Sequence, residues 1–294
     1  MQLEGRILKA ISGFYEVEAA DELYTCKARG VFRKTGITPL VGDFVRITPG
    51  SADEEGTVDA VLPRRNELSR PPVANLDNLF IIVSVCEPEP NALVIDRLTA
   101  IAEYKKIEPV IVVTKSDLGS DAPITEIYRK AGFRTFSVGE DDHSDVPQMR
   151  ELLRGRISAF TGNTGVGKST LLNALDPSLS IATAQISRKL GRGRHTTRHV
   201  ELYRTCGGYV ADTPGFSALD IENGEFIRKD ELADCFREFA PYLGECRFTS
   251  CAHVRDKGCR VLEAVDAGEI APSRHASYVT LYEEAKQIRD WQIK

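Results

Sequence analysis

The first 68 residues consist of short segments in which apolar and polar positions alternate, as in strands with one buried face. Turns rich in Gly, Pro and Asp separate the segments, which are LEGRILKA, FYEVEAA, ELYTCKA, DFVRITP and GTVDAVL. Five short strands in this length predict a small β-barrel, with an OB-fold as the leading candidate. A β-module without a ligand fits the same pattern, because a similar number of acids balances the basic residues.

From residue 69 onward the pattern changes to continuous apolar runs with helical stretches between them. The runs are LFIIVSV, PVIVVTK, RTFSV and RISAF, and the helical stretches include DRLTAIAEYKK and ITEIYRKAG. This alternation predicts a parallel sheet covered by helices on both faces, which we place in an α/β domain over residues 69–220. Residues 221–294 form a helical, Cys-containing domain. Its last helix has one apolar face, made by Tyr278, Leu281, Tyr282, Ala285 and Ile288.

Composition narrows the class of protein. The chain is 42% hydrophobic and 28% charged, as in soluble globular proteins, and its net charge of −5 restricts any contact with nucleic acid to local patches. The start, MQLEGRILKA, lacks the apolar core of a signal peptide, and no apolar run is long enough to span a bilayer. We therefore expect a cytoplasmic protein. We also expect it to be a monomer.

Residues 162–169, GNTGVGKS, match the phosphate-loop pattern G-x-x-x-x-G-K-[ST] in full. They follow the strand-like run RISAF and open a helix-like run, so backbone N–H groups can surround phosphates at a helix N-terminus. Lys168 is expected to reach the β- and γ-phosphates, and the Ser169 hydroxyl to bind Mg²⁺. The expected nucleotide contacts are Thr161, Gly162, Asn163, Thr164, Gly165, Val166, Gly167, Lys168, Ser169 and Thr170.

A second motif addresses the base of the nucleotide. Residues 114–117 end a buried strand, at the edge of the sheet where such folds bind ligands. The Asp117 carboxylate can accept hydrogen bonds from the N1–H and the exocyclic amine of guanine, a donor pair that adenine lacks. Lys115 is expected to pack its stem along the base. The expected base contacts are Thr114, Lys115, Ser116 and Asp117.

Residues 212–215, DTPG, follow the strand GYVA and match the D-x-x-G switch of GTPases. Asp212 is expected to bind Mg²⁺ through water, and the Gly215 N–H to sense the γ-phosphate. The segment GRGRHTTRH lies where switch I belongs, and Thr196 or Thr197 can supply the second Mg²⁺ ligand; we favour Thr197. The segment FSVGE, around Ser137, lies where a backbone loop would support the base.

The order of these motifs is unusual, because the base loop precedes the phosphate loop by about fifty residues. The order is base loop, base support, phosphate loop, switch I and switch II, which is a circular permutation of the GTPase order. Strands of one parallel sheet can be reconnected in this way if the old termini lie close together. Switch II then leads directly into the C-terminal domain.

Seven cysteines make an odd number, and three of them crowd together, which does not suit a disulfide framework. Cys246, Cys251, His253 and Cys259 supply three thiolates and one imidazole within fourteen residues. This set suits tetrahedral Zn²⁺, and four protein ligands close the site against catalysis. The metal is therefore expected to be structural, in a domain with few apolar residues.

Taken together, these motifs resemble the circularly permuted, ribosome small-subunit-dependent GTPases of the RsgA family. The resemblance rests on PPVANLDNLFIIVS, TKSDL, TGNTGVGKSTLLNAL, GRHTTRHVEL, DTPGF and the Cys-Cys-His-Cys spacing, and it covers nearly the whole chain. It implies an OB-fold that binds RNA over residues 1–68, a GTPase domain and a zinc domain. It also implies action on the 30S subunit and its 16S rRNA late in maturation, with GTP hydrolysis stimulated by the subunit. The chain departs from the family at Thr114, where Asn is common, and in SVGE, which lacks the usual Ser-Ala.

Phe216 occupies the place after D-x-x-G where many GTPases have a glutamine that orients the attacking water. The resemblance suggests His195 of switch I for this role, with Lys168 and Thr197 completing the catalytic set; a contact of His195 with RNA or solvent is the alternative. Residues 187–204 contain six Lys or Arg and one acid, a local basic patch suited to rRNA phosphates.

Two other functions fit parts of the sequence. An ATP-dependent P-loop enzyme would make Asp117 accidental, and a comparison of GDP and ADP binding separates the two enzymes. A zinc-and-OB RNA-binding protein with a degenerate nucleotide site is the third possibility. The intact Lys168, Ser169 and Asp212 argue against it.

Overall fold

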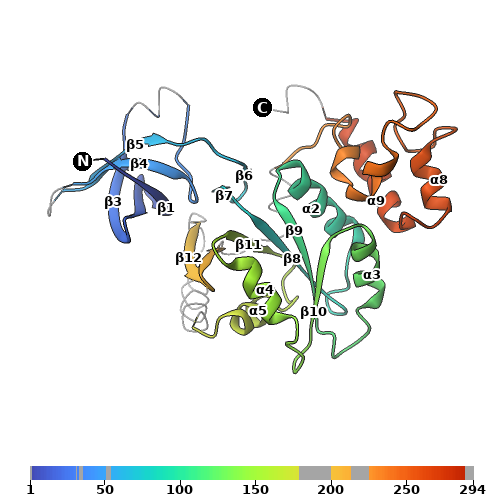
Figure 1. The fold of residues 1–294 in the computed structure, drawn as a ribbon, viewed down its shortest axis with the longest axis horizontal. Coiled ribbons are helices and arrows are strands. Elements are labelled where there is room, and N and C mark those ends of the chain that lie inside the picture. Colours follow the sequence, from blue (N-terminus) through green and yellow to red (C-terminus); the bar gives the residue numbers. More distant parts are fainter. Residues whose placement is uncertain are drawn as a thin grey trace. The chain divides into compact units, whose positions relative to one another are not determined.

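The computed structural model describes residues 2–30, 32, 36–50, 54–178, 200–212 and 225–288 (Figure 1). For Asp212 it describes the backbone alone. Two compact units divide the chain. One comprises Met1–Asn78, Val146–Phe160 and Ser169–Phe216, and the other comprises Leu79–Asp145, Thr161–Lys168 and Ser217–Lys294. Within the described ranges, every helix is too short or too polar to cross a membrane.

The first unit begins with a closed barrel. Its strands are β1 (Leu3–Ile11), β2 (Phe14–Ala19), β3 (Glu22–Ala28), β4 (Phe44–Thr48) and β5 (Gly56–Val61). In β2, apolar and polar residues alternate, which buries Tyr15, Val17 and Ala19 on one face of the strand. The strands pair in the cycle β1-β2-β3-β5-β4-β1, in which only β3 and β5 run parallel. The predicted barrel is confirmed.

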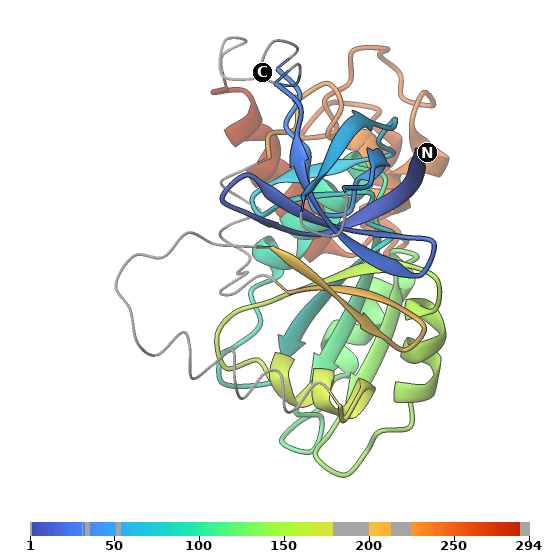
Figure 2. The ribbon, with the colours of Figure 1, turned by 90° about the vertical axis from the view of Figure 1, so that its left-hand side faces the viewer.

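The same unit contains strands from much later in the chain. It includes the short hairpin of β6 (Glu67–Ser69) and β7 (Pro72–Ala74), the helices α4 (Val146–Leu153) and α5 (Lys168–Leu175), and the strands β11 (Ile157–Thr161), β12 (Glu201–Thr205) and β13 (Gly208–Asp212). β13 runs parallel to β11 and antiparallel to β12, and β12 in turn pairs with β1 of the barrel (Figure 2). The antiparallel pair departs from the all-parallel prediction, because the two-residue turn Cys206–Gly207, with both φ angles positive, folds β12 and β13 into a hairpin.

The second unit contains the sheet order β10-β9-β8 (Figure 1). The strands are β8 (Asn78–Ser84), β9 (Glu108–Thr114) and β10 (Arg134–Val138), and the helices between them are α2 (Ala92–Tyr104) and α3 (Ala122–Lys130). Every residue of β8 is buried, as expected for a sheet covered on both faces. β9 and β10 run parallel, so the segments that follow them leave the sheet at the same edge.

The C-terminal part of this unit consists of η1 (Ala233–Cys235), η2 (Arg237–Tyr242), α8 (Arg260–Asp266) and α9 (Pro272–Ala285). The last helix begins at Pro272, a residue suited to a first turn, and it ends at Ala285, so Ile288, which was expected on its apolar face, lies beyond it. Tyr278, Leu281 and Ala285 are buried, as predicted for its apolar face.

Candidate nucleotide and metal sites

Thr114, the last residue of β9, connects the base loop to the phosphate loop. Its buried hydroxyl lies 2.6 Å from the carbonyl oxygen of Val166 and 3.0 Å from that of Val83. A hydroxyl has one proton, so it donates to one carbonyl at a time, and the shorter distance favours Val166. The side chain that replaces the family's common Asn therefore contacts the protein backbone on the inner side of the loop.

The phosphate loop turns around the buried side chain of Val166 and exposes Asn163, Thr164 and Gly165. Gly162 lies so close to β8 that a Cβ on it would come within 2.4 Å of the Ile82 carbonyl oxygen, so only glycine fits there. Thr161 is fully buried, and its hydroxyl has no hydrogen-bond partner among the described residues.

Two lysines donate to backbone carbonyls at this edge of the sheet. The Lys168 ammonium donates to the carbonyl of Gly162, across the mouth of the phosphate loop, and burial lowers the pKa of its amine. The Lys115 ammonium donates to the carbonyl of Glu87, in the segment between β8 and α2. Binding of phosphate beside Lys168 would favour its charged form and oppose the effect of burial.

The remaining predicted nucleotide contacts differ in how far the structure describes them. Ser169 and Thr170 are exposed in the first turn of α5. Ser116 is half-buried and Asp117 is exposed, directly after β9. Asp212 ends β13, where its backbone pairs with Glu201. The predicted residues outside the described part of the chain are His195, Thr196, Thr197, Gly215 and Phe216.

The segment between β8 and α2 is a part of the site that sequence reasoning missed. Pro88 and Asn91 line a cavity together with Gly162, Asn163 and Val166 of the phosphate loop. Asn91 also caps α2, since its side chain accepts a hydrogen bond of 3.3 Å from the Val94 N–H. The signal was the Pro-rich stretch CEPEPN directly after a buried strand, at the ligand-binding edge of the sheet.

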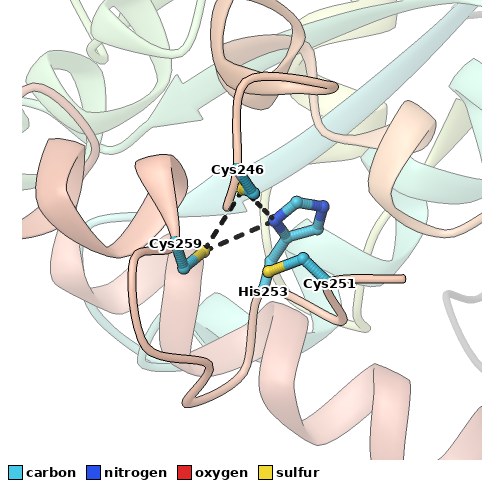
Figure 3. Close-up of side chains that lie close together, drawn as sticks. All are labelled: Cys246, Cys251, His253 and Cys259. Atoms are coloured by element: carbon cyan, nitrogen blue, oxygen red, sulfur yellow. Dashed lines mark hydrogen bonds between the residues drawn. The ribbon is translucent and has the colours of Figure 1, made fainter. Parts of the chain in front are cut away.

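The predicted metal ligands converge in the C-terminal part of the second unit (Figure 3). His253 Nδ1 lies 3.6 Å from Cys246 Sγ and 3.5 Å from Cys259 Sγ, and the two sulfurs are 3.9 Å apart. All four ligand atoms, including Cys251 Sγ, lie within 4.8 Å of one another. Tetrahedral zinc, with Zn–S of about 2.3 Å and Zn–N of about 2.0 Å, requires separations of about 3.5–3.8 Å between its ligands. The separations among Cys246, His253 and Cys259 are close to this range, so the set could hold such an ion.

Helix α9 holds the backbone that carries these ligands. His275 makes a 2.8 Å hydrogen bond to the His253 carbonyl, and the Tyr278 hydroxyl donates to the Ala252 carbonyl at 2.8 Å. Burial raises the pKa of the Cys251 thiol to about 12 and lowers the pKa of the His253 imidazole. A bound cation would stabilise the Cys251 thiolate and offset the effect of burial on its pKa.

The phosphate loop and the base loop each follow a buried strand, and a direct hydrogen bond joins them. This arrangement defines a P-loop GTPase fold. The base loop comes first in the chain, so the fold is circularly permuted. The barrel and the Cys-Cys-His-Cys cluster are its additions at the two ends. The predicted fold class is thereby confirmed.

Comparison with known proteins identifies the family. Residues 61–222 match the RsgA GTPase model and residues 4–58 match the RsgA N-terminal domain model. The small ribosomal subunit biogenesis GTPase RsgA of Alkaliphilus metalliredigens is 42% identical over 97% of this chain and 99% of its own length. The small ribosomal subunit biogenesis GTPase RsgA 2 of Oceanobacillus iheyensis is 44% identical, over 96% and 97%. The chain belongs to the RsgA GTPase family.

Solved structures agree with this assignment. YloQ, described as a circularly permuted GTPase, superposes with a TM-score of 0.80 at 34% identity, covering 98% of this chain and 97% of its own. YjeQ from Thermotoga maritima superposes with a TM-score of 0.81 at 33% identity, covering 98% and 100%. The circular permutation predicted from the motif order is confirmed.

Proposed function

We propose that this protein hydrolyses GTP and acts late in the maturation of the 30S ribosomal subunit, which stimulates the hydrolysis. The 2.6 Å hydrogen bond from Thr114 to Val166 carries the nucleotide part of the proposal, because it joins the base loop to the phosphate loop. The ribosomal part rests on relatives that are 42–44% identical over nearly their whole length and are named small ribosomal subunit biogenesis GTPases.

In the proposed complex, the N–H groups of the phosphate loop and the Lys168 ammonium bind the phosphates, and Asp117 accepts from guanine. Ser169 and Thr197 bind Mg²⁺ directly and Asp212 binds it through water. The ion neutralises negative charge on the phosphates. The exposed hydroxyl of Ser169 in the first turn of α5 is available for this role. Gly215 is assigned to sense the γ-phosphate.

The residues of the switches support the proposal that the 30S subunit stimulates GTP hydrolysis. Phe216 cannot orient water, so the group that activates water must come from elsewhere. We assign this role to His195, within the basic segment 187–204, which is suited to dock on 16S rRNA. His195→Ala should lose most of the stimulation by 30S and keep its affinity for GDP, because the histidine acts only in the transition state. Full stimulation in this variant, measured as turnover at saturating GTP, would remove the assignment.

The remaining assignments follow from the same family. Zinc is the proposed occupant of the Cys-Cys-His-Cys set, and the proposed domains are the RNA-binding barrel (1–68), the GTPase domain (69–220) and the zinc domain (221–294). The alternating burial in β2 supports a barrel in the first domain, and the separations among the Cys and His side chains support a metal site in the last. We further propose that the protein is a cytoplasmic monomer.

Nucleotide specificity tests the proposal most simply. Calorimetric titration should show much tighter binding of GDP than of ADP, because adenine leaves the Asp117 carboxylate unpaired. Each hydrogen bond to a charged group contributes about 1.5–3 kcal/mol, so Asp117→Asn should weaken GDP binding by about 100-fold or more. The variant should gain affinity for xanthosine diphosphate, whose extra carbonyl accepts from the new amide. Unchanged GDP affinity in Asp117→Asn would refute the assignment of a GTPase site.

A further inference from the structure

The exposed carboxylate of Asp117 is held by the backbone of the turn that follows β10. Asp117 Oδ1 accepts a hydrogen bond of 2.9 Å from the N–H of Glu140. A second bond joins the same two segments, because the Ser116 N–H donates to the Val138 carbonyl at 3.3 Å. An exposed aspartate would otherwise sample several rotamers, so the Glu140 N–H restricts the direction of its oxygens.

Gly139, the residue before this N–H, has little room for a side chain. It is buried, and a Cβ on it would lie 3.1 Å from Ser116 Oγ and 3.3 Å from Asp117 Oδ1. Both contacts are tighter than those that a Cβ atom normally makes, so the two neighbouring oxygens would have to move by a few tenths of an ångström. A methyl group at position 139 would therefore push on the carboxylate itself.

The turn cannot easily move away from that pressure, because its own hydrogen bonds fix it. The Gly139 N–H donates to the carbonyl of Asp142 at 3.1 Å. The Ser137 N–H donates to the side chain of Asp145 at 2.9 Å, and the Ser144 N–H to that of Asp142 at 3.0 Å. The strain of an added Cβ would consequently fall on Ser116 and Asp117.

We propose that Gly139 and the Glu140 N–H are specificity-determining elements for guanine, acting as positioning groups for Asp117. A carboxylate offers about four acceptor positions, so one backbone N–H leaves the others for the N1–H and the 2-amino group of the base. The orientation is set before the nucleotide binds, which reduces the entropy lost on binding. The turn replaces the Ser-Ala side chains that the segment SVGE lacks. The inference rests on the proposed function, because it assumes that Asp117 reads guanine.

The test compares GDP with inosine diphosphate, which lacks the 2-amino group, by calorimetry on the full-length protein. The wild type should prefer GDP. Gly139→Ala should weaken GDP binding by about 10- to 100-fold, as the loss of one hydrogen bond to a charged group predicts, and inosine diphosphate binding by less. The GDP preference should therefore approach one.

Two control variants separate positioning from general damage to the fold. Glu140→Ala keeps the N–H and removes only an exposed side chain, so its GDP preference should equal that of the wild type. Gly119→Ala adds a Cβ whose nearest neighbour, Val85, would be at an ordinary 3.5 Å, and it should also behave as the wild type. Glu140→Pro removes the donor itself and should reproduce the loss of preference seen in Gly139→Ala.

The inference is overturned if Gly139→Ala keeps the wild-type ratio of GDP to inosine diphosphate affinity. That holds whether both affinities stay unchanged or both fall by the same factor, since an equal fall means that the turn only supports the fold. Failure of the proposed function looks different: the wild type itself would then bind ADP as tightly as GDP.

Discussion

Replacing the buried Arg274 with methionine should destabilise the packing of α9 against α2. The Arg274 side chain is 1% exposed, and its guanidinium lies 2.7 Å from Asp96 of α2 and 2.6 Å from Glu238 of η2. It also donates to the Thr99 hydroxyl at 3.0 Å. Methionine has a comparable apolar stem and no charge, so the variant removes the ion pairs with little change in packing volume.

The loss of stability comes from the two buried carboxylates that remain after the substitution. The side chains of Asp96 and Glu238 are 1% and 6% exposed, so both carboxylates would stay buried without a cation. Removing one partner of a buried ion pair typically costs about 3–5 kcal/mol. Converted at about 1.4 kcal/mol per factor of ten, this is an increase of about 10²–10⁴ in the opening equilibrium of α9.

Hydrogen exchange of the α9 amides, measured by mass spectrometry on the full-length protein, reports this opening. Lys286→Met is the matched control, because Lys286 pairs with Glu283 at the exposed end of the same helix, at 2.8 Å. Exposed pairs contribute about 0–1 kcal/mol, so exchange in the control should rise by less than about fivefold. Exchange in Arg274→Met less than tenfold faster than in the wild type would refute the reasoning.

Two further substitutions test the nucleotide and metal sites. Thr114→Val keeps the side-chain shape and leaves the Val166 carbonyl without its donor, which costs about 1–3 kcal/mol. GDP affinity, measured by calorimetry, should therefore fall about tenfold. Unchanged GDP affinity would contradict the connection between the two loops. If the cluster binds zinc as proposed, Cys251→Ser, or chelation of the wild type, should abolish zinc binding and unfold the helices around the cluster while GDP binding survives. A full equivalent of zinc retained by Cys251→Ser, measured by metal analysis, would contradict its role as a ligand.

Local patterns made the strands, the phosphate loop and the Cys-Cys-His-Cys cluster predictable. Alternating burial needs only neighbouring residues, and GNTGVGKS encodes its own turn between a strand and a helix. The Cys246–Cys259 segment likewise brings its ligands together within fourteen residues. Features of this kind depend on short-range geometry, which a sequence pattern contains.

Contacts between distant segments were not predictable in the same way. Arg274 stands in the polar stretch PSRHASY, and its burial depends on Asp96, 178 residues earlier. The hydrogen bond from the Glu140 N–H to Asp117 joins the segments after β9 and β10. Its donor is a backbone group, which every residue type except proline has, so the sequence gives no signal for it. The Lys115 ammonium likewise donates to a backbone carbonyl, that of Glu87, and the packing of its stem along the base stays a prediction.

Turnover at saturating GTP, measured for the protein alone, with 30S subunits and with 50S subunits, tests the central claim most directly. Activating groups in related enzymes increase turnover by about 10³–10⁵-fold, so 30S should stimulate hydrolysis by at least about 100-fold and 50S should not. Raising the salt concentration should weaken the stimulation, since docking on RNA releases counterions. Equal turnover with and without 30S subunits would contradict the claim that the small subunit activates this GTPase.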